Sequence, residues 1–289
     1  MEYEKLLEKL VQQGKELEKL RGYTGADEII PLASLEFNDK PCAFKSKFPT
    51  LDILTDGLEP GELIVISGLT KNGKTTFSVN LTENFASQGI ESLWFSYEMP
   101  YRQFRKMFSE KIPQTIFVPL SLRNSTLLWI KSKILEGILK FGVKAVFIDH
   151  LGFLQDLVQK QDRRIEIDTI IREIKQMAIE LNITIFLIHH IKKIESGQIP
   201  HFEDLKESSA IAQDSDKVWM IWRDFVRSRR GELEMTGLTK FSVELDRQNG
   251  AYKKSFTLIF KNNKFQEYNE KQNPDTYQIT SRTETCREL

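Results

Sequence analysis

The segment GLTKNGKT, residues 68–75, constrains this chain more than any other part of its sequence. It matches the pattern G-x-x-x-x-G-K-[ST] and lies between an apolar run typical of a strand, Leu63–Ser67, and a helical pattern from Lys74 to about Gln88. Glycines in such a loop let backbone N–H groups surround phosphate oxygens, and the N-terminus of the following helix adds partial positive charge. The pattern therefore predicts a phosphate-binding loop in an α/β fold. A glycine-rich loop without a ligand is the simpler alternative, but the strand and helix on either side disfavour it.

The side chains of this loop are expected to share the binding of a nucleoside triphosphate. Lys74 is predicted to bridge the outer phosphates of ATP, and Thr75 to bind Mg²⁺ through its hydroxyl group. The remaining nucleotide contacts from the loop are predicted at Gly68, Lys71, Asn72, Gly73 and Thr76. The sequence thus predicts ATP as the substrate and Mg²⁺ as the cofactor.

Strand and helix patterns alternate along the centre of the chain. This alternation is typical of βαβ units and predicts a mainly parallel sheet of the α/β class. The last two strands are expected to form a hairpin that turns near residues 248–250. The expected elements are strands at Leu93–Ser96, Ala145–Asp149, Thr184–His189, Lys217–Trp222, Phe241–Leu245 and Ser255–Phe260, and a helix at Ile165–Leu181.

Two carboxylates follow predicted strands at the sheet edge where ligands bind in open α/β folds. Asp149 ends the strand Ala145–Asp149, which favours a metal-binding role beside the phosphate loop. Glu98 follows the strand that ends at Ser96 and is the candidate to orient the attacking water, which phosphoryl transfer to water requires. An exposed loop carboxylate with no catalytic role is the alternative for Glu98.

Composition leaves room for one large domain and gives no sign of a strongly charged surface. The 289 residues carry 41 basic and 41 acidic side chains, so any nucleic-acid site must be local. Cys42 and Cys286 are the only cysteines, and they suggest neither a disulfide framework nor a zinc site. We recognise no signal peptide and no membrane-spanning run, so we expect no membrane partner and a cytoplasmic location.

Segments on both sides of the central α/β pattern are expected to be appendages. Residues 1–22 place leucines on one face of a predicted amphipathic helix, which packs either on its own core or on a neighbouring subunit. Residues 23–47 show no sustained period and are predicted to be a connector. The polar residues 269–289 are predicted to form a disordered tail, which leaves residues 48–268 as the central domain.

From about Phe48 to Glu267, the chain resembles the C-terminal motor domain of the DnaB-type replicative ring helicases of bacteria and phages. Residues 204–216, DLKESSAIAQDSD, resemble that family's DLRESGAIEQDAD and are the most specific signal after the phosphate loop. The resemblance implies a P-loop ATPase fold of the RecA type. The other similar segments are the lead-in at residues 54–63, FSYEMP at 95–100 for FSLEMP, IDHL at 148–151 for IDYL, AIELNI at 178–183 for the start of AKELNVP, and RD at 223–224 for the end of YRD.

The resemblance also implies roles for individual side chains. Glu98 stands at the position of the family's catalytic glutamate, and Arg223 is expected at the nucleotide site. His190 resembles a histidine of the phage members that senses the γ-phosphate, although a structural histidine at a strand end is the alternative. Arg247 resembles the family's arginine finger, but Leu245 replaces the lysine that the family has two residues earlier. An exposed hairpin arginine is the alternative for Arg247.

Single-stranded DNA, in the resembled fold, contacts two loops that line the channel of the ring. The corresponding residues here are about 155–164 and 192–207, and six such weakly basic loops would track phosphates without reading sequence. A separate basic cluster at residues 227–230 fits either an exposed turn or an outer nucleic-acid contact. The candidate DNA-binding residues are Lys160, Arg163, Arg164, Lys192, Lys193 and Lys206.

The favoured interpretation is an ATP-driven hexameric translocase that separates duplex DNA while moving 5′ to 3′ on one strand. A second interpretation is an ATP-dependent scaffold, such as a recombination mediator or a KaiC-like assembly, that binds DNA without unwinding it. A third, a small-molecule kinase, would need a lid and an acceptor pocket that nothing in the sequence suggests. A loader or primase is the expected partner. Because family members carry an N-terminal domain where only residues 1–47 stand here, the chain is expected to be a minimal or excised motor.

Overall fold

The computed structural model describes residues 44–108, 111–122, 125–154, 163–191, 194, 198–205, 210–227, 233–250 and 252–269. The expected helix at residues 1–22, the expected connector up to residue 43 and the expected tail from residue 270 lie outside these ranges. The candidate DNA-binding residues Lys160, Lys192, Lys193 and Lys206 lie outside them as well. Every described helix is too short or too polar to cross a lipid bilayer.

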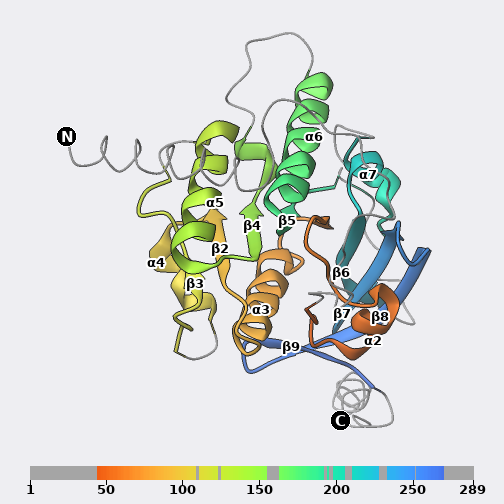
Figure 1. Cartoon of the computed structure of the whole chain (residues 1–289). Helices are drawn as coiled ribbons and strands as arrows, with labels where there is room; N and C mark the ends of the chain where they lie inside the picture. Colours follow the sequence, from red (N-terminus) through yellow and green to blue (C-terminus); the bar gives the residue numbers. More distant parts are fainter. Residues whose placement is uncertain are drawn as a thin grey trace, which may run out of the picture.

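The described strands form one sheet in the order β3-β2-β4-β5-β1-β6-β7-β8-β9 (Figure 1). Neighbours from β3 to β6 in this order pair in parallel, and β7, β8 and β9 extend the sheet with antiparallel pairs. The strands are β1 Leu63–Ser67, β2 Ser92–Ser96, β3 Ile116–Phe117, β4 Ala145–Asp149, β5 Thr184–Ile188, β6 Lys217–Arg227, β7 Leu233–Asp246, β8 Tyr252–Lys261 and β9 Lys264–Glu267. The fold is thus the predicted α/β class with a mainly parallel sheet.

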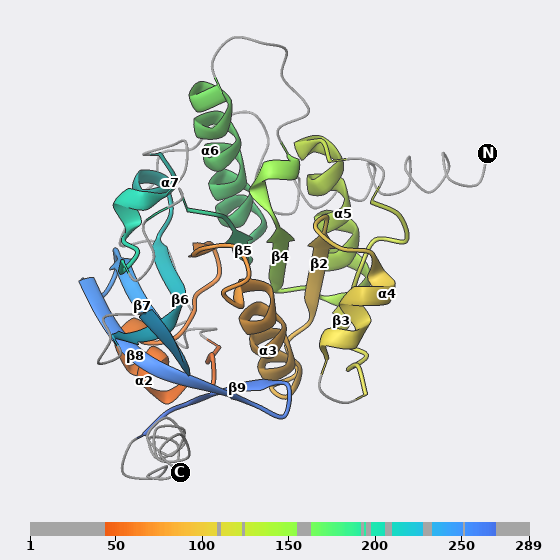
Figure 2. The ribbon, with the colours of Figure 1, turned by 180° about the vertical axis from the view of Figure 1, so that it is seen from behind.

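Helices pack on both faces of this sheet (Figures 1 and 2). They are α2 Pro49–Thr55, α3 Lys74–Ala86, α4 Tyr101–Phe104, α5 Leu127–Phe141, α6 Arg163–Leu181 and α7 Ala210–Asp214, with short 3-10 turns at Arg105–Met107, Leu151–Phe153 and Phe202–Asp204. Because side chains alternate along a strand, Leu63 and Val65 of β1 face the core under α5 and α6. Ile64 and Ile66 face the opposite core, under α2 and α3.

The core under α2 and α3 is rich in aromatic side chains. Trp94 of β2, Phe147 of β4 and Phe186 of β5 stack in a row across three neighbouring strands, with ring centroids 4.6 and 4.5 Å apart. Offset stacking of this kind adds to the stabilisation from burial. The row fixes the register of the strands whose carboxyl ends carry Glu98 and Asp149.

The packed unit of the described residues begins at Phe44, four residues before the boundary expected at residue 48. The backbone of Phe44 pairs with that of Leu58 through two hydrogen bonds of 3.1 and 3.0 Å, and the Phe44 side chain is buried against Phe85. Residues 44–47, which the sequence placed in a connector, therefore pack with the central domain. Residues 44–47 are too few to show a periodic pattern, so their burial could not be predicted from the sequence.

The predicted strands are confirmed in place, with differences at their ends. β5 ends at Ile188, one residue earlier than expected, and β6 and β7 are longer than their apolar runs. Helices α2, α4, α5 and α7 and strands β3 and β9 were not among the predicted elements. The helix α5 nonetheless carries clear signals, because the Thr126 side chain caps its first turn and Gly142 ends it at a φ of 72°.

Different segments of the chain lie at the carboxyl ends and at the amino ends of the parallel strands. The phosphate loop follows β1 at the carboxyl edge of the parallel strands, where β2, β4 and β5 also end. Lys217, the first residue of β6, pairs with Ile64 near the start of β1 and with Asp246 at the end of β7. The turn after Asp246 therefore lies at the amino edge, on the far side of the sheet from the phosphate loop.

Candidate active site

The backbone of the phosphate loop requires glycine at two positions. Gly68 has a φ of 148°, and a Cβ atom there would lie 2.1 Å from the carbonyl oxygen of Ile221 on β6. Gly73, with a φ of 95°, immediately precedes α3, and a Cβ atom there would lie 3.0 Å from the Phe265 ring. Close packing against β6 and β9 thus demands the glycine spacing that the sequence pattern shows.

The ammonium group of Lys74 lies inside the loop. Its Nζ donates hydrogen bonds to the carbonyl oxygens of Gly68 (3.0 Å) and Leu69 (2.9 Å), and the residue is 5% exposed. Burial lowers the pKa of Lys74 to about 8, and the carboxylates of Asp149 and Glu98 oppose that shift. A buried cation whose hydrogen bonds go to neutral carbonyl groups is well suited to bind the oxygens of a polyphosphate.

Asp149 and Thr75 form the predicted metal-binding pair. The Thr75 hydroxyl donates to Oδ2 of Asp149 at 2.8 Å, and Asp149 is completely buried. Its Oδ1 accepts no hydrogen bond from the described residues. Burial raises the pKa of Asp149 to about 7; the bond from Thr75 opposes this, the charge of Glu98 adds to it, and Lys74 opposes it. A hydroxyl oxygen beside a carboxylate oxygen that lacks a donor is the ligand chemistry that Mg²⁺ prefers, so these two residues fit the expected ion.

Glu98 lies next to this pair and is tied to it through the backbone. The N–H groups of Tyr97 and Glu98 both donate to the carbonyl oxygen of Asp149, at 2.8 and 3.2 Å. The Glu98 side chain is exposed and lines a cavity of about 370 Å³ between residues 96–101 and 120–122. An exposed carboxylate that is held close to Asp149, the predicted metal ligand, is suitably placed to orient water.

His190 follows β5 and lies beside a second histidine, His150, which follows Asp149. The two rings are 4.6 Å apart between centroids, at an angle of 75°. Glu98, His150 and His190 each place one ligand-type atom within 4.8 Å of the others. His150 had no predicted role, although its position directly after Asp149, the predicted metal ligand, could have indicated one.

Hydrogen bonding at His150 argues against a second metal at this cluster. The N–H of Gly152 donates to Nδ1 of His150 at 3.0 Å, so the neutral ring carries its proton on Nε2. A metal-binding histidine normally donates its second N–H to an acceptor, and here that nitrogen accepts instead. The three side chains are therefore better suited to hydrogen bonding than to holding an ion.

The other predicted nucleotide contacts lie in or beside the loop. Asn72 is 8% exposed, and its Oδ1 accepts from the N–H of Arg223, at 3.0 Å, which ties the loop to β6. The Arg223 guanidinium lies 3.4 Å from the hydroxyl of Thr239 on β7. Lys71 is exposed at the tip of the loop, and Thr76 is half-buried in the first turn of α3. All of these residues lie in or next to the loop, but Arg223 contacts it through its backbone N–H and not through its guanidinium.

Arg247 is not part of this cluster. It follows β7 in the turn at the amino edge, where its N–H donates to the carbonyl oxygen of Asp216 at 3.0 Å. The residue is exposed. The structure thus separates Arg247 from the phosphate loop of its own chain.

The candidate DNA-binding residues are only partly described. Arg163 and Arg164 were expected in a loop, but they are the first two residues of α6. This placement corrects the expected loop, which ends before residue 163. The helix begins at Arg163, two residues before the start that the apolar pattern suggested.

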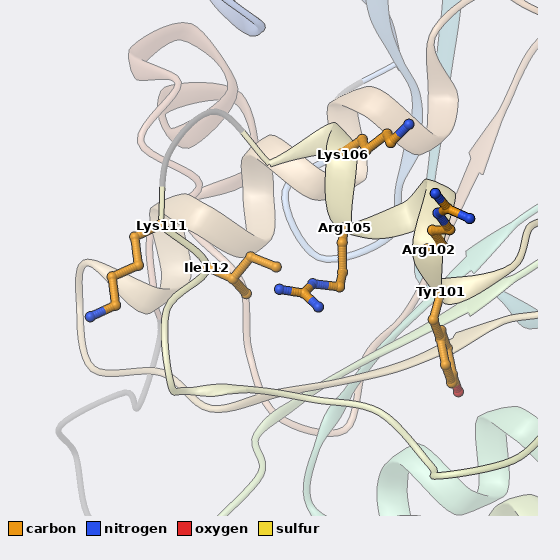
Figure 3. A pocket seen from close by; sticks show the side chains of 6 residues that line it. All are labelled: Tyr101, Arg102, Arg105, Lys106, Lys111 and Ile112. Carbon is orange, nitrogen blue, oxygen red and sulfur yellow. The ribbon is translucent and has the colours of Figure 1, made fainter.

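A separate basic cavity lies at α4 and the turn after it (Figure 3). It has a volume of about 840 Å³, and its cationic lining residues are Arg102, Arg105, Lys106 and Lys111. Figure 3 shows Arg105 directed toward Ile112, whereas the side chains of Lys106 and Lys111 point in different directions. The four cations do not converge on one point, so the cavity is a positive surface and not a compact anion site.

This chain is similar to known proteins both in sequence and in fold. The DnaB-like helicase C-terminal domain family matches residues 43–113 and 110–270. A probable replicative DNA helicase from Trieres chinensis is 29% identical over 217 residues, which are 62% of this chain and 47% of that protein. Replicative DNA helicase DnaB from Haemophilus influenzae is 26% identical over 242 residues, 71% of this chain and 52% of that protein. The chain spans about half the length of these curated relatives.

Solved structures show the same fold. One of them, an isolated ATPase domain, superposes with a TM-score of 0.67 at 18% identity, covering 89% of this chain and 98% of that one. A DnaB-like replicative helicase, described with its interactions with primase, superposes with a TM-score of 0.69 at 17% identity, covering 93% of this chain and 76% of that one. The family match spans most of the chain and includes the phosphate loop, Glu98 and Asp149. This chain therefore belongs to the DnaB-like helicase C-terminal domain family.

Proposed function

We propose that this chain is the ATP-hydrolysing motor of a hexameric ring that moves on single-stranded DNA and separates the strands of a duplex. The position of Arg247 carries this proposal. β1 has five residues, so the phosphate loop and the Arg247 turn are separated by about 16 Å of strand at about 3.3 Å per residue. An arginine side chain is much shorter than that. Arg247 can therefore act on ATP only when the ATP is bound to a neighbouring subunit.

The proposed hydrolysis combines residues from two subunits. One subunit supplies Lys74, which binds the outer phosphates, and Glu98, which orients the attacking water. Held by Thr75 and Asp149, Mg²⁺ would offset negative charge on the phosphates. The neighbouring subunit supplies Arg247, whose guanidinium neutralises charge that develops on the γ-phosphate.

His190 is the proposed link between nucleotide and DNA. It lies at the carboxyl edge of the sheet beside His150 and close to Glu98, and the chain continues from it toward the second candidate DNA loop. A group near the γ-phosphate at the start of that loop is suitably placed to change the loop's position when ATP is hydrolysed. We assign the DNA contacts to Lys160, Arg163, Arg164, Lys192, Lys193 and Lys206.

The direction of movement and the partners also belong to the proposal. We infer movement 5′ to 3′ and a cytoplasmic location. A primase or loader is the expected partner, supported by the primase interaction named for the similar helicase structure.

Strand displacement on forked DNA tests the proposal. We expect ATP-dependent displacement when the fork has a 5′ tail and none when it has only a 3′ tail. A Lys74→Ala variant is the matched control, because it keeps the fold and removes the phosphate-binding cation. ATPase activity without displacement on either fork would contradict a motor and favour an ATP-dependent DNA-binding scaffold.

A further inference from the structure

A completely buried lysine lies beneath the turn that carries Arg247. Lys217 is 0% exposed, and its Nζ forms an ion pair with the Glu62 carboxylate. The same Nζ lies 3.3 Å from Oε1 of Gln248 and 3.9 Å from Oδ2 of Asp246. Lysine is rarely buried without such partners. One ammonium group thus connects the loop before β1 with both neighbours of Arg247 in the sequence.

The turn itself is held by further bonds from the same groups. Oδ1 of Asp246 accepts from the N–H groups of Gln248 and Asn249, at 3.0 and 3.1 Å. The Gln248 side chain also donates to Glu59 at 2.9 Å. The N–H groups of Gln248 and Asn249 are therefore held by a carboxylate that lies beside Lys217, while the N–H of Arg247 is held by the carbonyl oxygen of Asp216.

Stability alone is a weak reason for this arrangement. Burial raises the pKa of Glu62, and the Lys217 charge opposes that shift, as expected for an ion pair that costs desolvation energy. Buried ion pairs often contribute little net stability compared with apolar groups of the same size, but their geometry is specific. Apolar residues at positions 62 and 217 would fill the same space without holding Asp246 and Gln248.

We propose that Lys217 is a positioning residue that sets the placement of Arg247 for the neighbouring subunit's ATP. This inference rests on the proposed function, because it requires Arg247 to act across the interface. Lys217 itself does not touch ATP. It fixes Asp246 and Gln248, and these residues fix the backbone from which the guanidinium extends.

A double-mutant cycle tests this assignment in the full-length chain. The pair Glu62→Gln and Lys217→Met removes both charges of the closest ion pair together, while Asp246 keeps the hydrogen bonds that it accepts from Gln248 and Asn249. We expect kcat for ATP to fall about 10- to 100-fold, because a misplacement of about 1 Å has an effect of that order, while KM changes little. In an Arg247→Ala background, the same pair should lower kcat further by less than about twofold, since residues that act through one group are not additive.

Controls separate positioning from general destabilisation. Leu258→Ala, in the buried core on β8, should lower the melting temperature without the loss of kcat. Gln248→Ala changes an exposed side chain and keeps the test possible if the paired variant fails to fold. Its expected effect is a fall in kcat of about threefold, typical of one hydrogen bond, that disappears in the Arg247→Ala background.

The outcomes distinguish the positioning role of Lys217 from the shared active site on which that role depends. An equal further fall of kcat in the Arg247→Ala background would show that Lys217 acts by another route and would overturn the positioning role alone. An unchanged kcat in the paired variant, with rings confirmed by native mass spectrometry, would overturn it as well. An unchanged kcat in Arg247→Ala itself would overturn the shared active site, and the positioning role with it.

Discussion

Two variants that are each expected to be nearly inactive can show whether ATP is hydrolysed between subunits. Arg247→Ala removes the proposed arginine finger and keeps the phosphate loop intact. Lys74→Ala removes the cation of the loop and keeps Arg247. Because these residues lie at opposite edges of the sheet, an intact loop and an intact finger can meet only across an interface between the two kinds of subunit.

The magnitude of the recovery follows from this geometry. Each variant alone should be about 10³-fold slower than the wild type or worse, as for other phosphoryl-transfer enzymes without their arginine. In rings mixed at equal amounts, an active interface needs the intact phosphate loop of an Arg247→Ala subunit to face the intact arginine of a Lys74→Ala subunit. With random assembly into a head-to-tail ring, half of the loops and half of the fingers are intact, so about one quarter of the interfaces are active. We therefore expect up to about a quarter of the wild-type ATPase rate.

The assay measures the ATPase rate against the ratio of the two subunits, after native mass spectrometry has confirmed mixed rings. The rate should be highest near equal amounts, because it depends on the product of the two fractions. A mixture of Lys74→Ala with Glu98→Gln is the matched control and should show no recovery, since both changes damage the loop side of the interface. No recovery in confirmed mixed rings of Arg247→Ala and Lys74→Ala would refute the shared site.

Three further predictions concern the carboxyl edge, and the third uses Gly89, which precedes the amino end of β2, for comparison. Lys74→Ala should weaken ATP binding and abolish hydrolysis, whereas Glu98→Gln should keep ATP bound and stop turnover; hydrolysis by Glu98→Gln within about threefold of wild type would place water orientation elsewhere. His190→Ala should leave ATP affinity nearly unchanged and abolish stimulation of the ATPase by single-stranded DNA, and normal stimulation would return His190 to a structural role. Gly89→Ala, with a φ of 71° and no atom within 4 Å of an added Cβ, should cost about 1–2 kcal/mol of unfolding free energy and keep ATP affinity. Gly68→Ala should lose more stability than Gly89→Ala and should also lose ATP affinity, because its Cβ would lie 2.1 Å from a backbone oxygen of β6. Equal effects of the two changes on chemical denaturation and on ATP binding would contradict this reasoning.

The sequence by itself determined the position of the phosphate loop, the parallel strands, and the placement of Glu98 and Asp149 at the carboxyl ends of two strands. A phosphate loop needs glycines, a lysine and a hydroxyl at fixed spacing, and central parallel strands need continuous apolar runs, so both leave local patterns. The predicted strands β1, β2, β4 and β5 are confirmed to within one residue, whereas β6, β7 and β8 extend beyond the predicted ranges. Short elements such as β3 and β9 were not predicted, because two to four residues carry too little pattern to distinguish a strand from a loop.

Tertiary structure decided which distant residues meet. Nothing local marks Lys217 as buried, because its burial depends on a carboxylate 155 positions earlier in the chain that pairs with it only when β1 and β6 lie side by side. The proximity of His150, His190 and Glu98 likewise follows from three strands that end at one edge. The separation of Arg247 from its own phosphate loop depends on β7 running antiparallel to β6, a pairing that brings the end of β7 back to the amino edge. Contacts of this kind are set by sheet order and strand direction, which a linear pattern of residue types does not contain.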